Sequence, residues 1–378
     1  MTPSAESRPK RIVLCLVANE HVIHRAAGAV QYLQIGLIDE PFDSLLVIPE
    51  SGGSRLLAAG PANIVTHRSG SRFLSHWTMR RTAAIVQERI AELRHDGPVI
   101  VHALDGQACR LAAQIASTVG GQLVLTLSSL DDLADPRLPV VARDSALIIV
   151  PCRALCEAVK QSSFGHVKIE TILVGTTATR SPSAFREPDR TPSLIYAGPL
   201  KEESGCDTLL RAVQQVLQAH PTLQVFLVGK GRGESALRAL ARALEVGSNV
   251  TFTGRLDNWR TALDGADVFC LPCRHRSVRE EPLQAMADGL AMVAAENPLY
   301  ESFADRATAM IYDEGEPTDL AERILELLED RNKARQLAAM AQSYMREHHS
   351  IDRMITEHVR CYRQVAGPSD VIQHPAAR

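Results

Sequence analysis

The stretch ADVFCLPCRHRSVREEPLQAMADGLAMVAA, residues 266–295, predicts a strand, a turn, a helix and a second strand in immediate succession. Val268–Leu271 and Ala291–Ala295 are short runs of apolar residues, and residues 280–290 between them have the pattern of a helix. Uninterrupted apolar strands of this length are typical of a parallel sheet that is covered on both faces. The stretch therefore favours an α/β fold built from repeated strand and helix units.

The same alternation extends over most of the chain. In the second half we expect strands at 193–197, 223–228 and 250–253, with helices at 206–219 and 234–244. In the first half we expect strands at 11–17, 44–48, 64–66, 98–102, 122–127 and 146–150, with helices at 23–36, 78–94 and 107–119. Helical periodicity continues through 319–329, 332–348 and 351–365. The predicted fold class is α/β, with two doubly wound Rossmann-like domains facing each other across a cleft.

A proline-rich segment, TRSPSAFREPDRTP at residues 179–192, interrupts the periodicity and indicates the linker between the two domains. We therefore predict a first domain at 1–185 and a second domain at 186–350. A C-terminal helix at 351–366 is expected to pack back across the boundary. The tail at 367–378 is expected to be flexible.

The composition of the 378 residues is that of a globular protein without a basic surface for nucleic acid. Hydrophobic residues make up 45% and charged residues 22% of the chain, and the formal net charge is -3. Without an excess of positive charge, binding to a nucleic-acid backbone is not expected. The N-terminal MTPSAESRPKR has no apolar core typical of a secretion signal, so we expect a cytoplasmic protein.

The eight cysteines lie mostly in apolar segments, which favours reduced core thiols over disulfides. Cys270 and Cys273 form a CxxC pair, which could be a redox pair or half of a zinc site. No second pair of cysteines or histidines at zinc spacing completes such a site. We therefore expect one thiol at a strand end, one in the following turn, and no metal.

Several phrases of the chain resemble the GT-B fold glycosyltransferases of family 4. YAGPLKEESGCDTLLRA at 196–212, FLVGKGRGESALRALA at 226–241 and VTFTGRL at 250–256 look like successive motifs of that family. ADVFCLP and QAMADGLAMVA follow at the family's spacing, and ALIIVPCRALCEAVKQ and ILVGTT match more weakly in the first half. The resemblance implies a retaining, metal-independent transferase that takes a sugar from a UDP- or GDP-sugar, with the acceptor on the first domain and the donor on the second.

The resemblance also implies partners and a role. The acceptor would be a glycan or a lipid-linked molecule in polysaccharide or glycoconjugate assembly, and no further cofactor is needed. Peripheral association with a membrane and a partner glycosyltransferase are left open by the sequence. A nicotinamide-dependent oxidoreductase is poorly supported as a competing class, because the first strand ends in VANEHVIHRAAG, with no GxGxxG turn and no acidic residue placed for a ribose.

Five positions depart from the family pattern. The family's two phosphate-binding cations fall on Pro199 and Ser204, and its two glutamates fall on Arg276 and Gln284. The family's histidine beside the transferring sugar falls on Ser128. Each lost charged hydrogen bond removes about 1.5–3 kcal/mol of donor affinity unless another residue replaces it.

Candidate donor-binding residues remain on the same turns. Glycines after strands let a backbone approach a phosphate, basic side chains can neutralise it, and Gln284 can still bind a ribose hydroxyl. Arg232 lies on the same loops and could also supply charge to a phosphate. The glycines also fit plain turns, and the basic side chains also fit a solvated rim. The candidates are Gly198, Lys201, Gly229, Lys230, Gly231, Arg276, Ser277, Arg279 and Gln284.

Two groups of residues allow alternative roles. Glu280 and Glu281 could replace the missing glutamates, but acidic residues are also favoured in the first turn of a helix, which is the role we expect. His21, His24 and His102 could line an acceptor site, although a surface or core position is expected for each. The sequence identifies no catalytic residue.

Two functions of different class follow. The chain is either a sugar transferase with relocated phosphate-binding cations, or a catalytically inactive pseudo-glycosyltransferase that acts as a scaffold or regulatory subunit. The joint change of five related positions motivates the second hypothesis.

Overall fold

The computed structural model describes residues 11–50, 63–67, 76–93, 97–187, 189–256 and 258–367, with only the backbone described for residues 21, 24 and 25. The predicted tail beyond residue 367 lies outside this part of the chain. The described residues form two compact units. The first unit comprises the chain up to Leu173 together with the segment from Ile351 onward, and the second comprises Val174–Ser350.

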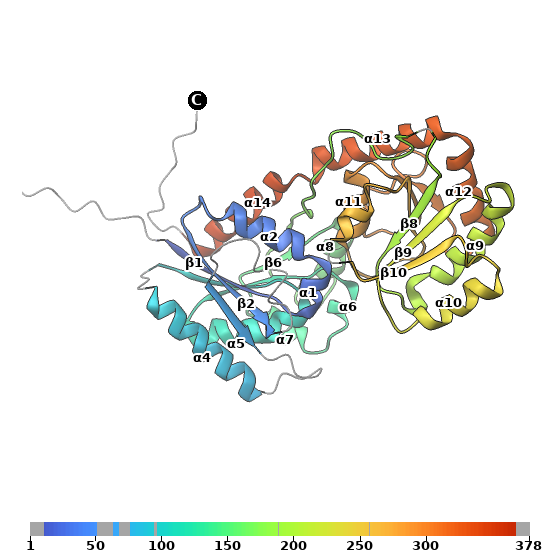
Figure 1. Ribbon diagram of the computed structural model, residues 1–378. Coiled ribbons are helices and arrows are strands. Elements are labelled where there is room, and N and C mark those ends of the chain that lie inside the picture. The colour runs from blue at the N-terminus through green and yellow to red at the C-terminus, as the bar shows by residue number, and fades with distance from the viewer. Residues whose placement is uncertain are drawn as a thin grey trace, which may run out of the picture. The chain divides into compact units, whose positions relative to one another are not determined.

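The first unit contains a parallel sheet of order β3-β2-β1-β4-β5-β6-β7 with helices on both faces (Figure 1). Every strand pair in it is parallel, as the apolar runs predict. Its strands are β1 (Ile12–Val17), β2 (Phe42–Pro49), β3 (Asn63–His67), β4 (Val99–Ala103), β5 (Gln122–Thr126), β6 (Leu147–Val150) and β7 (Ile169–Thr171). Its helices are α1 (Glu20–Arg25), α2 (Ala27–Gly36), α4 (His76–Glu92), η3 (Gly106–Ala108), α5 (Cys109–Val119), α6 (Leu130–Leu133), α7 (Leu138–Ala142), α8 (Arg153–Lys160) and α14 (Ile351–Ala366).

The second unit contains a parallel sheet of order β10-β9-β8-β11-β12-β13. Its strands are β8 (Ser193–Ala197), β9 (Gln224–Val228), β10 (Val250–Gly254), β11 (Val268–Leu271), β12 (Ala291–Ala295) and β13 (Met310–Tyr312). Its helices are η4 (Glu202–Ser204), α9 (Cys206–Ala219), α10 (Glu234–Ala243), η5 (Trp259–Ala262), α11 (Glu280–Ala287), α12 (Pro317–Glu329) and α13 (Arg331–His348). The α/β class with two doubly wound sheets is confirmed.

The helix predicted at 23–36 is interrupted. Asn19 caps the short helix α1, whose amide of Val22 donates to the Asn19 side chain at 3.0 Å. The backbone then leaves helical geometry at Ala26, where φ is -138°, and α2 begins at the next residue. The prediction of one continuous helix was wrong because apolar spacing continues through the break.

The proline-rich segment packs with the second unit. The carboxylate of Asp267, 2% exposed, accepts hydrogen bonds from the amides of Phe185 and Ser193, each at 2.9 Å, and from Arg190 at 2.7 Å. These bonds hold Phe185, Arg190 and Ser193 against the start of β11. The units accordingly divide at 173/174, before the segment that the sequence indicates as the linker.

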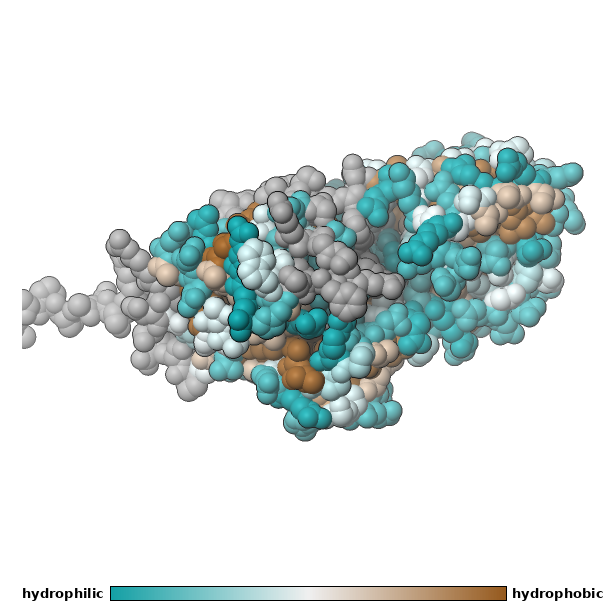
Figure 2. Space-filling view, turned by 90° about the horizontal axis from the view of Figure 1, so that it is seen from below, coloured by the Kyte–Doolittle hydropathy of each residue, from teal (hydrophilic) through white to brown (hydrophobic). Residues whose placement is uncertain are grey.

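The C-terminal helix α14 follows the second unit in the chain but belongs to the first unit. It packs against α2 and β4, and Tyr362 on it is fully buried in the core of the first unit. Figure 2 shows one face of the molecule, on which hydrophilic side chains cover most of the described surface and apolar patches are small.

Candidate functional site

In the second sheet, the direction in which successive strands are added reverses between β8 and β11. From β8 the chain continues to β9 and β10 on one side, and later to β11 and β12 on the other side. Loops that leave neighbouring strands in opposite directions open a crevice, and ligands of doubly wound folds bind there, outside the carboxyl ends of the strands. The candidate residues all lie on the loops after β8, β9 and β11 or in α11. The structure therefore brings the loop candidates to one edge of one sheet.

The glycine turns after β8 and β9 pack directly on each other. Gly198 donates its amide to the carbonyl of Val228 at 2.9 Å. A Cβ atom on Gly229, whose φ is +148°, would lie 1.8 Å from the Gly198 carbonyl oxygen, and one on Gly231 would lie 1.9 Å from that of Leu200. Backbone packing within the protein thus requires glycine at both positions.

Three cations project from these joined turns. Lys201, Lys230 and Arg232 are exposed, and none of them forms an ion pair with a described residue. The backbone amides nearby are less available, because Gly233 donates to Leu200 at 2.9 Å and Glu234 to Gly231 at 3.2 Å. An anion at this edge would therefore depend on side-chain cations more than on the N-terminal amides of α10.

The positions of the two missing family cations have structural roles. The carbonyl of Pro199 accepts the hydroxyl of Tyr196 at 3.0 Å. Ser204 is 2% exposed and its hydroxyl donates to the carbonyl of Lys201 at 2.6 Å. These contacts fix the turn after β8, and neither side chain offers charge to a ligand.

A buried ion pair lies at the start of α11. Arg279 is the N-cap residue, and its guanidinium forms an ion pair with the carboxylate of Glu281. The Arg279 amide donates to the hydroxyl of Tyr300 at 3.0 Å. Burial lowers the pKa of Arg279, but the Glu281 carboxylate outweighs this and leaves the pKa raised. Arg279 is therefore a neutralised cation, whereas Arg276 nearby is exposed and Ser277 is buried.

Glu280 and Glu281 occupy the first turn of α11, the role that the sequence favoured. Both are buried, and Glu280 lies 3.8 Å from Arg260. Gln284, 1% exposed, uses its amide nitrogen to bond the carbonyl of Thr177 at 2.7 Å and the carboxylate of Asp288 at 2.9 Å. Only its Oε1 lacks a partner among the described residues. Burial raises the pKa of Asp288 to about 6.

In the first sheet, the direction in which successive strands are added reverses between β1 and β4. There Asn19 donates its side-chain amide to Asp105 at 2.9 Å and to Gln107 at 3.4 Å. Asp105 also caps η3 through the amide of Ala108 at 2.9 Å. This polar cluster was missed by the sequence analysis, although an Asn and an Asp directly after two buried strands were a usable signal.

Two other candidate positions of the first unit, His102 and Ser128, have partners of their own. His102 is fully buried, with Nδ1 2.7 Å from the Tyr362 hydroxyl and Nε2 2.8 Å from the Thr126 hydroxyl, so the expected core position is confirmed. The amide of Ser128 bonds to Asp132 at 3.1 Å. The side chains of His21 and His24 lie outside the described residues.

The cysteines behave as core thiols. All eight are free, and seven are buried. Burial raises the pKa of Cys273 to about 12, so the thiol is protonated at neutral pH and is a poor nucleophile. Among the residues that the structure describes, no group of three or more His, Cys, Asp or Glu side chains could hold a metal ion. No helix in the same ranges is long and apolar enough to cross a membrane.

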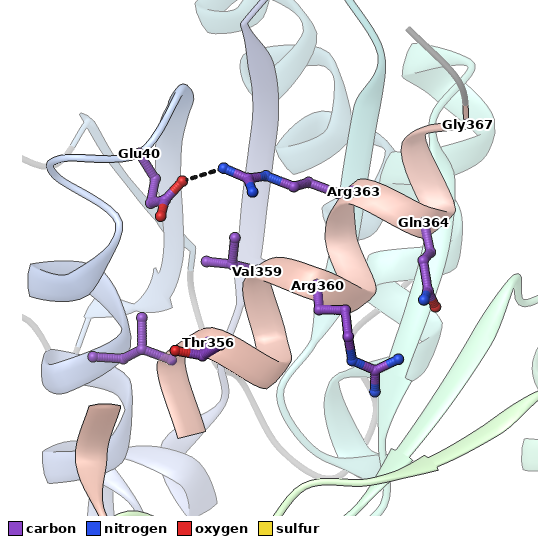
Figure 3. A pocket seen from close by; sticks show the side chains of 8 residues that line it. Glu40, Thr356, Val359, Arg360, Arg363, Gln364 and Gly367 are labelled. Atoms are coloured by element: carbon purple, nitrogen blue, oxygen red, sulfur yellow. Dashed lines mark hydrogen bonds and ion pairs between the residues drawn. The ribbon is translucent and has the colours of Figure 1, made fainter. Parts of the chain in front are cut away.

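A groove in the first unit lies along α14 (Figure 3). It encloses about 700 Å³. Arg363 bonds to Glu40 at 2.6 Å and Arg360 to Glu170 at 3.0 Å, so both cations already have carboxylate partners. None of the candidate residues lines it. Its lining residues are Glu40, Ile355, Thr356, Val359, Arg360, Arg363, Gln364 and Gly367.

A family model and several curated proteins match part of this chain. Residues 191–330 match the family model described as "Glycosyl transferases group 1". A GDP-mannose-dependent monoacylated alpha-(1-6)-phosphatidylinositol monomannoside mannosyltransferase of Corynebacterium glutamicum is 31% identical over 178 residues, 45% of this chain and 46% of the relative. A related mannosyltransferase of Mycobacterium tuberculosis is 27% identical over 41% of this chain and 43% of the relative. The chain thus matches less than half the length of these curated relatives.

Solved structures resemble the chain over nearly its whole length. HepE of Anabaena in complex with UDP and glucose has a TM-score of 0.76 at 16% identity, covering 93% of this chain and 99% of the other. A glycosyltransferase of Rickettsia africae has the same TM-score at 12% identity, covering 95% and 100%. At such identities the likeness establishes the fold. Residues 191–330 therefore match the group 1 glycosyltransferase family model, and the chain has the GT-B fold that the sequence predicted.

Proposed function

We propose that the protein transfers a sugar from a nucleotide-sugar donor to a glycan or lipid-linked acceptor, with retention of configuration and without a metal ion. The observation that carries the proposal is the set of three exposed cations, Lys201, Lys230 and Arg232, which have no ion-pair partner among the described residues. They lie where the strand order reverses in the unit that matches the group 1 glycosyltransferase model. A donor diphosphate requires fixed positive charge there, and the family's own cation positions supply none.

The donor would lie with its diphosphate against the turns after β8 and β9. Gly198, Gly229 and Gly231 let these turns pack closely on each other. Lys201, Lys230 and Arg232 would neutralise the phosphates and the departing nucleotide. Arg276, exposed on the loop after β11, could bind the same anion from the other side of the crevice. Support for a nucleotide-sugar comes from relatives, since HepE is described with UDP-glucose and the mannosyltransferases as GDP-mannose-dependent.

The remaining candidates would position the donor. Gln284 has one buried carbonyl oxygen without a partner among the described residues, which can accept one ribose hydroxyl. Ser277 and Arg279 would act indirectly, by fixing the loop before α11 through Tyr300. Catalysis in this scheme consists of holding donor and acceptor together and stabilising negative charge on the leaving diphosphate. No residue is assigned as nucleophile or base.

The relatives also support a class of acceptor and a place of work. The curated relatives act on phosphatidylinositol mannosides according to their names, which supports a lipid-linked acceptor and work at a membrane surface from the cytoplasm. Association with a second glycosyltransferase remains part of the proposal for polysaccharide or glycoconjugate assembly.

Calorimetric titration with UDP, GDP, UDP-glucose and GDP-mannose at concentrations up to millimolar tests the donor site. Lys201→Ala/Lys230→Ala should weaken nucleotide binding by about tenfold or more, because two phosphate contacts are lost. Arg211→Ala/Arg242→Ala removes the same charge from exposed positions on α9 and α10 and should leave affinity unchanged. A flat titration with every nucleotide would instead support the scaffold hypothesis and reject the transferase.

A further inference from the structure

Helix α4 of the first unit exposes a tryptophan. Its inner face consists of Met79, Thr82, Ala83 and Val86, which are buried, and the helix packs on α5. Trp77 lies on the opposite face and is 69% exposed. A large aromatic side chain gains most from being covered, so one left this open on a stable helix indicates a surface that meets something else.

Two arginines share the exposed face. Arg80 and Arg81 lie three and four residues after Trp77, which places all three side chains on neighbouring positions of the helix surface. The guanidinium carbon of Arg81 lies 5.7 Å from the centroid of the Trp77 ring. Neither arginine forms an ion pair with a carboxylate of the described chain. The patch is thus aromatic and carries two positive charges that no described carboxylate pairs with.

Further along the helix, the exposed face changes in character. Ile85, 37% exposed, extends the apolar part by one turn. The acidic residues Glu88 and Glu92 come only after it, and Glu92 is paired with Arg89 at 2.9 Å. Positive charge therefore gathers on the first two turns of α4, beside the tryptophan.

We propose that the face of α4 formed by Trp77, Arg80 and Arg81 docks the protein on an anionic phospholipid surface. Tryptophan favours the level of the lipid headgroups, where its ring is in an apolar and its N–H in a polar environment. Arginines beside it bind lipid phosphates, and an anionic membrane attracts both. The combination fits a charged membrane better than a protein partner, because the patch has two like charges and little continuous apolar area.

This inference rests on the proposed function, because a lipid-linked acceptor is the reason for the protein to bind a membrane. A transferase with a lipid-linked acceptor must reach the headgroup from the water side, and no helix among the described ranges could cross the bilayer. A docking face on the first unit would hold the protein at the surface where such an acceptor lies.

Vesicle binding tests the proposal directly. The full chain should sediment with vesicles of phosphatidylcholine and phosphatidylglycerol, and much less with phosphatidylcholine alone. Arg80→Glu/Arg81→Glu should weaken binding to the anionic vesicles by at least about tenfold, and Trp77→Ser should weaken it measurably. Ile38→Ser, at another exposed apolar position of the first unit, and Arg211→Glu/Arg242→Glu in the second unit are the matched controls.

The two tryptophans allow a second measurement that does not depend on affinity. In a Trp259→Phe variant, Trp77 is the single tryptophan, and excitation selective for tryptophan reports on it alone. Its emission should shift to the blue on anionic vesicles and be quenched by brominated lipid. Equal binding of the α4 variants and the wild type, equal loss in the controls, or an unshifted Trp77 emission would overturn the proposal. Nucleotide titration without vesicles is unaffected by these changes, so failure of the docking face and failure of the transferase are separately visible.

Discussion

Arg279 and Glu281, two residues apart at the start of α11, form an ion pair in which the side chains are only 6% and 10% exposed. Removing two charges from water costs free energy that their attraction repays only when the remaining polar atoms are satisfied. Here Arg279 Nε and Glu281 Oε2 have no hydrogen-bond partner among the described residues. The pair therefore fixes the entry to α11 more than it adds net stability.

Removing one partner should be far more costly than removing both. Glu281→Gln leaves a buried guanidinium without a counter-charge and should lower the free energy of unfolding by about 3–5 kcal/mol in urea titration. Arg279→Met/Glu281→Leu keeps the volume without the charges and should cost about 1 kcal/mol or less. The control is Glu280→Gln, which removes the neighbouring carboxylate and leaves the Arg279–Glu281 pair in place. Equal losses in the single and the double variant would contradict this account.

The fold was predictable because its main signals are local. Apolar runs give buried parallel strands wherever helices cover both faces, and this holds for β8, β9, β11 and β12. The strands that the sequence analysis missed, β7 and β13, have three residues each at the edges of the sheets. Such short segments carry too few residues for periodicity to distinguish them from loops.

The candidate site was predictable in position but not in bonding. The strand ends placed the loop candidates at one sheet edge. Which side chains stay available depends on residues distant in sequence, as for Gln284, bonded to Thr177, and Asn19, bonded to Asp105. Burial also decides which cations a ligand can reach. Arg279 and Arg276 are three residues apart, and only Arg276 is exposed. No pattern in a single sequence contains this information.

Gly229→Ala should disrupt the joined turns after β8 and β9. The new Cβ would lie 1.8 Å from the Gly198 carbonyl oxygen, and the backbone angle of +148° is strained for any other residue. We expect a loss of about 2 kcal/mol or more in the free energy of unfolding, together with weaker nucleotide binding. Gly247→Ala, where nothing lies within 4 Å, should change stability by less than about 1 kcal/mol. Similar stabilities of the two variants would show that the turns are not packed as described.

Restoring the family's cation at Ser204 should destabilise the protein. Ser204 is 2% exposed, and its hydroxyl is bonded to the carbonyl of Lys201. Ser204→Lys must therefore bury an ammonium group or push the turn outward, and we expect a loss of about 2 kcal/mol or more. Ser248→Lys, at an exposed position of the same unit, is the control and should be nearly neutral. A stable Ser204→Lys variant with improved nucleotide binding would contradict the structural role of this serine.

Asp288 should make the second unit more stable in mild acid. Its pKa is raised by burial to about 6 from an ordinary value of 3.8, so the folded protein binds the proton more readily than the unfolded chain. Stability from this group is therefore gained as the pH falls through 6 and is absent above it. Asp288→Asn keeps an acceptor for Gln284 without the charge, and should raise the free energy of unfolding at pH 8 by about 1–2 kcal/mol. Thermal unfolding at pH 8 and pH 5 measures this, and a variant that is less stable at both values would refute it.

His102 should make the first unit less stable as the pH falls, the opposite of the effect of Asp288 on the second unit. It is buried between Tyr362 and Thr126, and burial, followed by the nearby His358, holds its pKa well below the ordinary value of 6.5. The unfolded chain then binds a proton near pH 6 that the folded protein does not. Stability from His102 is fully present above pH 6.5 and is lost as the pH falls toward the lowered pKa. Burial lowers the pKa of His358 as well, so both rings contribute with the same sign.

His102→Gln separates this effect from general acid denaturation. The variant should be less stable at pH 7, because the hydrogen bonds that join β4, β5 and α14 are weakened. Its loss of stability between pH 7 and pH 5 should be smaller than that of the wild type by up to about 1.4 kcal/mol per pH unit, the slope of one titrating group. His166→Gln, at an exposed position of the same unit, should keep the wild-type slope. Urea unfolding monitored across this range is the measurement, and an unchanged slope in His102→Gln would mean that the buried ring is not the group that resists protonation.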